Sequence, residues 1–233
     1  GRSYEGTITG STFQTDSRRF STLNLGSSPG QITFGSDQTE ITEISASLAR
    51  LPAVSLQNSD LVSDEGRVQS FQRPQQNPTF LATLSRLDHV AFGSWYRVER
   101  PDLIYIGAAA GGIRTPGSEV PTSGSAVYNG AVTGVVVMPS ATAMVRGPGT
   151  LTADFGARTI AGDFTGLRSI DVATAENRPF NSISVSGRWT PGANTYSGGA
   201  TVGVSPGGPS ALPNGSGGPM SCLLYTSDAA DEE

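Results

Sequence analysis

The sequence predicts an all-β protein built from antiparallel strands. Three observations predict this class: short apolar runs bounded by Gly, Pro, Asn and Ser clusters recur, helix signals are scarce, and apolar alternation is clear in the second half. The best helix candidate is residues 38–51, where Ile41, Ile44 and Leu48 recur at intervals of three and four. This segment is also rich in Thr, Ser and Ile, so a strand at residues 40–46 competes with the helix.

The first half of the chain contains strand candidates at irregular spacing, with long polar loops between them. We therefore expect residues 1–120 to form a looser β-rich region. The predicted strands of this region are residues 3–9, 31–34, 66–71, 86–92 and 103–108.

The second half has regular strands that each present one apolar face. Leu151, Ala153 and Phe155 alternate with polar residues, and a turn at Gly156 and Ala157, with Gly supplying a positive φ, predicts a tight hairpin. Successive strands with short turns predict that residues 121–221 form a small up-and-down antiparallel barrel. The predicted strands are residues 126–138, 150–155, 158–167, 181–189 and 194–204.

The residue types that are missing exclude several kinds of chemistry. All 15 basic residues are arginine, so neither a P-loop lysine nor a Schiff-base lysine is available. The single histidine, His89, cannot build a multi-histidine zinc site. No nucleophile-elbow motif accompanies any serine, and no basic patch favours nucleic acid. We therefore predict no enzyme, no catalytic or metal-binding residues and no cofactor.

The C-terminus resembles the translation of a sequencing adapter, because residues 222–232 read CLLYTSDAADE. We expect residues 222–233 to be a non-native tail. This tail holds the only cysteine and four acidic residues, and without it the formal net charge of −5 becomes −1. The remaining chain has no thiol and no disulfide framework.

Several motifs resemble the transferrin-binding protein B-like surface lipoproteins. The segments 115–116 (TP) and 120–130 (VPTSGSAVYNG) are similar to the entry of that family's barrel, and 149–162 (GTLTADFGARTIAG) is similar to its next hairpin. Residues 92–95 (FGSW) resemble a step that precedes the barrel. The resemblance covers about residues 86–204. The family barrel has eight strands, so it implies a handle region at 1–120 and an incomplete barrel at 121–221.

This resemblance implies a non-enzymatic protein at the cell surface of a Gram-negative bacterium, either anchored to the outer membrane or secreted. Its implied partner is an extracellular protein or a haem or iron carrier, in host-protein binding or iron acquisition. Membrane contact is implied only through a lipid anchor that this sequence lacks, and we expect a monomer when the protein is intact. A transmembrane outer-membrane barrel is the alternative, and it requires an apolar outer band with aromatic girdles.

Five residues are candidates for binding. His89 is a candidate haem ligand, although a single histidine in an alternating segment is more often a packed or surface residue. Trp95, Tyr96, Arg97 and Arg100 are candidate partner contacts, because Trp, Tyr and Arg dominate interaction hot spots. The favoured alternative is that Trp95 lies in the core and that the arginines form a solvated strand face.

Two carboxylates, Asp154 and Asp163, fall on facing strands of the predicted hairpin. Paired carboxylates carry out glycoside hydrolysis when they lie at the correct separation. On a barrel hairpin, outward-facing residues that maintain solubility are the better interpretation, so we expect both side chains to be exposed.

Overall fold

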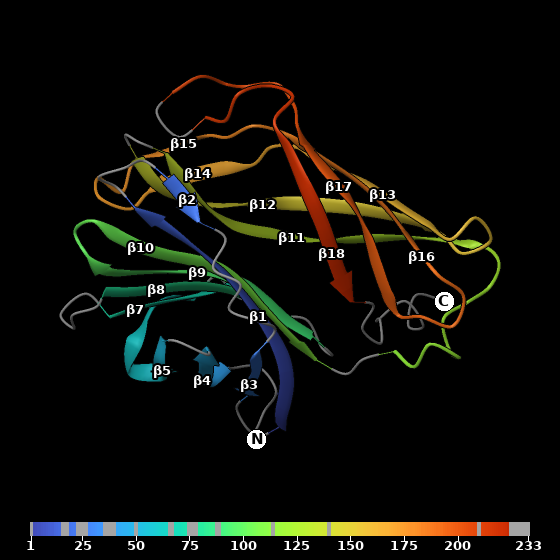
Figure 1. Ribbon diagram of the computed structural model, residues 1–233, viewed down its shortest axis with the longest axis horizontal. Coiled ribbons are helices and arrows are strands. Elements are labelled where there is room, and N and C mark those ends of the chain that lie inside the picture. Colours follow the sequence, from blue (N-terminus) through green and yellow to red (C-terminus); the bar gives the residue numbers. More distant parts are fainter. Residues whose placement is uncertain are drawn as a thin grey trace. The chain divides into compact units, whose positions relative to one another are not determined.

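In its described residues, a computed structural model of the chain shows antiparallel β-strands joined by turns, with one short 3-10 helix (Figure 1). No helix among the described residues has the length and apolar character that a membrane span requires. The predicted all-β, antiparallel class is therefore confirmed. The structure describes residues 2–14, 19–21, 28–34, 41–48, 51–64, 68–73, 79–86, 90–112, 115–138, 141–208 and 211–223.

Contacts divide the chain into two compact units. The first comprises Gly1–Gly112 with Thr133–Pro139, and the second comprises Ile113–Val132 with Ser140–Glu233. The assignment of residues 1–120 to a handle, 121–221 to a partial barrel and 222–233 to a non-native tail stays a prediction.

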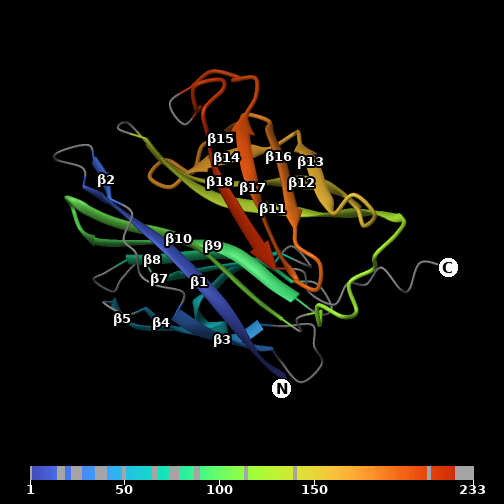
Figure 2. The same ribbon diagram turned by 45° about the vertical axis from the view of Figure 1, so that its right-hand side comes forward.

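The first unit contains one large sheet in the strand order β5-β4-β3-β1-β10-β9-β8-β7-β6, with β2 paired to β1. Figure 2 shows β7, β8, β9 and β10 side by side. The two end strands, β5 and β6, are joined by the short helix η1, where the Gln57 N–H donates to Asp60 Oδ2 at 2.9 Å. The elements are β1 (Arg2–Gln14), β2 (Arg19–Ser21), β3 (Ser28–Phe34), β4 (Ile41–Leu48), β5 (Leu51–Gln57), η1 (Asn58–Asp60), β6 (Leu61–Asp64), β7 (Val68–Arg73), β8 (Thr79–Arg86), β9 (Val90–Arg100) and β10 (Leu103–Gly112).

The competition between helix and strand at residues 38–51 is resolved in favour of strands. β4 pairs with β3 on one side and with β5 on the other, so the apolar residues join a ladder in place of a helix face. Long-range pairing overrides the local helical spacing here.

The second sheet has the order β15-β14-β12-β13-β16-β17-β18, with β11 paired to β12. β12, β13, β16, β17 and β18 pair antiparallel in that order, as in the predicted up-and-down arrangement, whereas β14 pairs with β12 and β15 pairs with β14. Within the described residues no pairing joins β11 to β18. The strands are β11 (Ser125–Met138), β12 (Ala141–Asp154), β13 (Thr159–Phe164), β14 (Arg168–Asp171), β15 (Asn177–Pro179), β16 (Ile183–Trp189), β17 (Thr195–Val202) and β18 (Gly217–Leu223).

The second sheet is interrupted at one level along β12. β13 and β16 lie on one side of this break, and β14 and β15 lie on the other. β13 and β14 both pair with β12, which continues unbroken past the gap between them. β16 pairs with β13, and β15 pairs with β14. Thr150 lies opposite Asp163, whereas Arg146 lies opposite Arg168, so the β13–β14 side contains one extra residue. This bulge exchanges the faces on which inward and outward side chains lie.

The core of the second unit forms on the predicted apolar faces. Phe155 and Trp189 pack edge to face, with ring centroids 5.9 Å apart and an interplanar angle of 66°. Buried members of this cluster are Val120, Ala153, Phe155, Ile160, Trp189 and Tyr196, with Ala126, Tyr128, Leu151 and Met220 packed against them.

The turn between β12 and β13 differs from the prediction. The expectation that Gly156 supplies a positive φ is wrong, because Arg158 has the left-handed φ of 57°. The Ala157 N–H donates to Asp154 Oδ1 at 2.8 Å, which stabilises the turn ahead of Arg158. The side chain of Asp154 thus fixes a geometry that glycine was expected to provide.

Candidate partner-binding surface

The β9–β10 hairpin carries the partner-contact candidates of the first unit. Its turn is Pro101 and Asp102, since Arg100 lies opposite Leu103. One step further, Val98 lies opposite Ile104, so Glu99 is an extra residue on the β9 side. A bulge of this kind increases the local twist and changes the direction of nearby side chains.

Trp95, Tyr96 and Arg97 are consecutive and all buried, with 5%, 3% and 4% of their surface exposed. Consecutive residues of a strand point to opposite faces, so both faces of β9 are covered here. Burial raises the pKa of the Tyr96 phenol above its ordinary value. The adjacent Ser94 Oγ lies 2.7 Å from Thr133 Oγ1, within the same unit.

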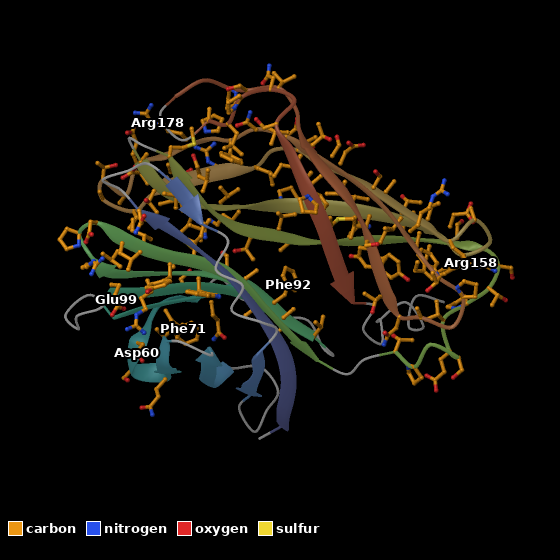
Figure 3. All side chains as sticks on the ribbon, viewed as in Figure 1. Asp60, Phe71, Phe92, Glu99, Arg158 and Arg178 are labelled. Atoms are coloured by element: carbon orange, nitrogen blue, oxygen red, sulfur yellow. The ribbon has the colours of Figure 1, made fainter. Side chains whose placement is uncertain are left out.

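The buried Arg97 guanidinium is neutralised by the bulge residue Glu99. Arg97 Nε and Nη2 each lie 2.8 Å from Glu99 Oε2. Glu99 is 36% exposed, so the pair spans from the interior to the surface near the hairpin turn. Figure 3 labels Glu99 at this end of the first sheet. An ion pair with one fully buried member holds the base of the turn in place.

The tip of the hairpin is exposed and charged. Arg100 Nε lies 2.8 Å from Asp102 Oδ1, and the two side chains are 60% and 44% exposed. Of the four predicted partner contacts, the structure places Arg100 at the surface and the other three in the interior. The predicted core position of Trp95 therefore agrees with its burial, whereas Arg97 is not on a solvated face. Partner contact by the four residues stays a prediction, and His89 lies outside the described residues.

In the second unit, the outward positions of β12, β13, β16 and β17 are mostly small and polar. They alternate with the buried residues of the core, as the strand period requires. Ser184 Oγ donates to Asp163 Oδ1 at 2.5 Å across neighbouring strands. The exposed hydroxyl and charged residues are Thr150, Thr152, Asp154, Asp163, Ser184, Ser186, Arg188, Thr195, Ser197 and Thr201.

Asp154 and Asp163 are both exposed, as expected, and they are too far apart to work as a pair. Asp163 lies opposite Thr150, four residues along β12 from Asp154. At about 3.3 Å a residue this is about 13 Å, beyond the range of about 5 to 9.5 Å between glycosidase carboxylates. Each carboxylate has its own partner, Ser184 or the Ala157 N–H. No group of His, Cys, Asp and Glu suited to a metal ion occurs within the described ranges.

A charged turn with several internal hydrogen bonds joins β14 to β15. Asp171 Oδ1 accepts hydrogen bonds from the Ala173 N–H, the Thr174 N–H and Thr174 Oγ1, at 2.9, 2.8 and 3.1 Å. The Thr174 N–H bond is the main cause that lowers the pKa of Asp171. Arg178 Nη2 donates to Glu176 Oε2 at 2.6 Å, and this bond raises the pKa of Arg178. Figure 3 shows Arg178 and Arg158 at opposite ends of the second sheet.

A buried amide ties a second loop to the same end of the unit. Asn181 is fully buried at the break between β15 and β16. Its Oδ1 accepts from the Leu212 N–H at 2.8 Å, and its Nδ2 donates to the Leu212 carbonyl at 3.1 Å. The Asn181 side chain thus bonds to both backbone groups of Leu212, as a paired strand residue would, and Gly208 lies beside Arg178.

Neither the turn at Asp171 nor the buried Asn181 is among the features predicted from the sequence. An aspartate followed three residues later by a threonine, as at Asp171 and Thr174, is a local signal for a side-chain-capped turn. Asn181 has no comparable signal, because its partner Leu212 is distant in the sequence.

No protein-family model matches the chain, and no curated protein matches it. Solved structures of transferrin-binding protein B resemble its fold. A mutant of the vaccine antigen TbpB from Haemophilus parasuis Hp5 is 15% identical, with a TM-score of 0.49, over 96% of this chain. Isotype 1 TbpB from serogroup B Neisseria meningitidis is 18% identical, with a TM-score of 0.46, over 96% of this chain. Intact Ap-TbpB is 16% identical, with a TM-score of 0.46, over 84%. The chain spans 40%, 39% and 34% of these structures.

Proposed function

We propose that the chain is part of a non-enzymatic surface protein of a Gram-negative bacterium that binds an extracellular protein partner. In this proposal residues 1–120 form a handle that contacts the partner, and residues 121–221 form a partial barrel. The motif resemblance at residues 86–204 motivates the cell-surface setting. The observation that carries the binding role is the β9–β10 tip, an exposed charged turn on a buried, ion-paired base.

The tip suits recognition because its geometry is fixed before a partner arrives. Loops on a rigid scaffold carry binding residues more often than the scaffold itself. The Arg97–Glu99 pair anchors the base of the turn, and the Arg100–Asp102 pair orders the charged groups at its end. Prior ordering lowers the entropy that a partner contact would otherwise cost.

The outer face of the second sheet supports this proposal over a transmembrane barrel. A barrel in lipid directs apolar residues outward, with polar residues toward its lumen. Here the arrangement is reversed, since Phe155 and Trp189 lie in the core and the outward positions carry Ser, Thr, Asp and Arg. This face is suited to water.

A more specific proposal about the partner and the location of the protein follows from the sequence resemblance. The partner would be a host protein or a carrier of iron or haem, and the intact protein would act as a monomer. The protein would reach the cell surface through a lipid anchor or be secreted. His89 remains the candidate haem ligand.

Biolayer interferometry against a panel of purified host iron- and haem-carrying proteins tests the proposal. We expect one member to bind and Arg100→Glu to weaken it about 30-fold, the effect of about 2 kcal/mol at a hot spot. Arg188→Glu is the matched control, because it reverses another exposed arginine, one that lies on the other unit. Binding that is unchanged by Arg100→Glu, or absent across the panel, would overturn the proposal. A haem titration of wild type and His89→Ala tests the ligand separately, through loss of the Soret band.

A further inference from the structure

Within the described residues, β18 lies at one end of the second sheet and pairs on one side only, which leaves an open edge there. It pairs with β17 along one side, from Thr201 opposite Gly217 to Thr195 opposite Leu223. No described strand pairs with its other side. Pro219 lies inside β18, opposite Gly199. Proline has no backbone N–H, so the direction in which its nitrogen points decides what this edge can bind.

Three backbone hydrogen bonds fix that direction. In an antiparallel ladder, alternate residues of a strand bond to the neighbour on one side and then to the neighbour on the other. The Trp189 N–H donates to the Arg158 carbonyl, so the odd residues of β16 bond toward β13 and the even ones toward β17. The Gly203 N–H donates to the Ser182 carbonyl, which agrees that even positions of β16 bond toward β17.

The same alternation continues into β18. Odd positions of β17 bond toward β16, so its even positions bond toward β18. The Val202 N–H donates to the Ser216 carbonyl at 2.6 Å, as this requires. With the register of β18, residues 218, 220 and 222 therefore bond toward β17. The backbone groups of the odd-numbered residues, including the nitrogen of Pro219, therefore point away from β17, into the open edge.

An added strand would therefore meet no donor at the centre of this edge. It would find a proline ring where the ladder needs an N–H, and proline inside a sheet is confined to edges and bulges. Two other strands at the ends of the sheet order, β5 and β15, also contain a proline, at Pro52 and Pro179. Proline is a recurrent means of blocking edge-to-edge association.

We propose that Pro219 closes the edge of β18 against strand addition by a second copy of this chain. The outward neighbours Gly217 and Ser221 are small and uncharged, so they give no other protection. The proposal goes beyond the binding function, because it concerns association between copies and does not depend on any partner.

Sedimentation velocity over a range of concentrations tests this proposal. Wild type should sediment as a monomer throughout, and Pro219→Val should shift to dimers and larger species as the concentration rises. Pro206→Val is the matched control, because it removes an exposed proline outside the strands and should stay monomeric. A Pro219→Val protein that remains monomeric would refute the proposal.

Crosslinking tests whether the edge itself is the interface. In a Cys222→Ser background, Ser221→Cys introduces a thiol at a residue of β18 whose backbone groups face the open edge. Combined with Pro219→Val it should form disulfide-linked dimers under mild oxidation, and without Pro219→Val it should not. Association without crosslinking would place the contact elsewhere and would overturn the assignment, as would crosslinking that is equal in the presence of Pro219.

Discussion

Replacing Gly198 with alanine should destabilise the second unit far more than the same change at Gly199. Gly198 lies directly opposite Gly187, where β16 and β17 approach closely. A Cβ on Gly198 would meet the Gly187 Cα at 2.5 Å and the Ser186 carbonyl carbon at 2.7 Å, with the Ser186 oxygen closer still. These are backbone atoms, so no side-chain rotation can relieve the overlap.

The geometry sets the size of the effect. Moving the Gly187 Cα from 2.5 Å to an ordinary contact of 3.4 Å separates the strands by at least 0.9 Å, and the closer Ser186 oxygen requires more. That displacement would stretch neighbouring hydrogen bonds of about 2.9 Å beyond about 3.5 Å. Overpacking costs about 1 to 3 kcal/mol, and each weakened hydrogen bond adds about 1 kcal/mol. We expect a loss of about 3 kcal/mol, or about 12 °C in Tm for a unit of this size.

Urea unfolding followed by tryptophan fluorescence measures this loss, because Trp189 lies in the core of the same unit. Gly199→Ala is the control, since its Cβ would meet only the Gly218 oxygen, at 3.8 Å. That variant should unfold within about 0.5 kcal/mol of wild type. Equal midpoints for the two variants would refute the close approach of the strands.

Three further predictions follow from buried or hydrogen-bonded polar groups. Glu99→Gln leaves the buried Arg97 without a countercharge and should lower the free energy of unfolding in urea by about 2 kcal/mol. The loss is smaller than for a fully buried pair because Glu99 is partly exposed. An unchanged midpoint would contradict this. The Thr174 N–H lowers the pKa of Asp171, so this stabilisation is present above the ordinary carboxyl pKa of about 4 and is lost as the pH falls through the lower folded value. Asp171→Asn should therefore flatten the acid limb of the stability–pH curve, and an unchanged limb would count against it. Asn181→Ala leaves the partly buried N–H and carbonyl of Leu212 without their side-chain partner and should cost about 2 kcal/mol, with faster amide exchange at Leu212. Unaltered exchange at Leu212 would contradict the role of the amide.

The parts of the fold that the sequence predicts are those governed by local alternation. The apolar residues of β16, Val185 and Trp189, are buried as their period-two spacing indicates. The first part of β12 was not predicted, because Gly147, Pro148 and Gly149 are typical of a loop. The structure keeps this segment in the strand, with Pro148 between the residues that pair with β14 and those that pair with β13.

The interruption between β13 and β14 was not predictable for a related reason. The extra residue exchanges the inward and outward faces after Phe164, so a single alternation cannot be followed through residues 158–167. For the candidate surface, residue type predicted that Arg100 is a possible contact. It did not distinguish Arg100 from Arg97, because the bulge at Glu99 that draws Arg97 into an ion pair depends on the register with β10.

The shared break in the second sheet divides its hydrogen-bond ladder into two segments held on one continuous strand. β12 carries the longer segment through β13 and β16, and the shorter one through β14 and β15. The shorter segment has few ladder bonds. The adjacent loop is held by the hydrogen bonds between the Asn181 amide and the Leu212 backbone. Such an arrangement can open in two steps, with the short segment exchanging its amides before the Trp189 core does. The charged turn at residues 171–178 can then rearrange at a cost well below that of unfolding the sheet beneath it.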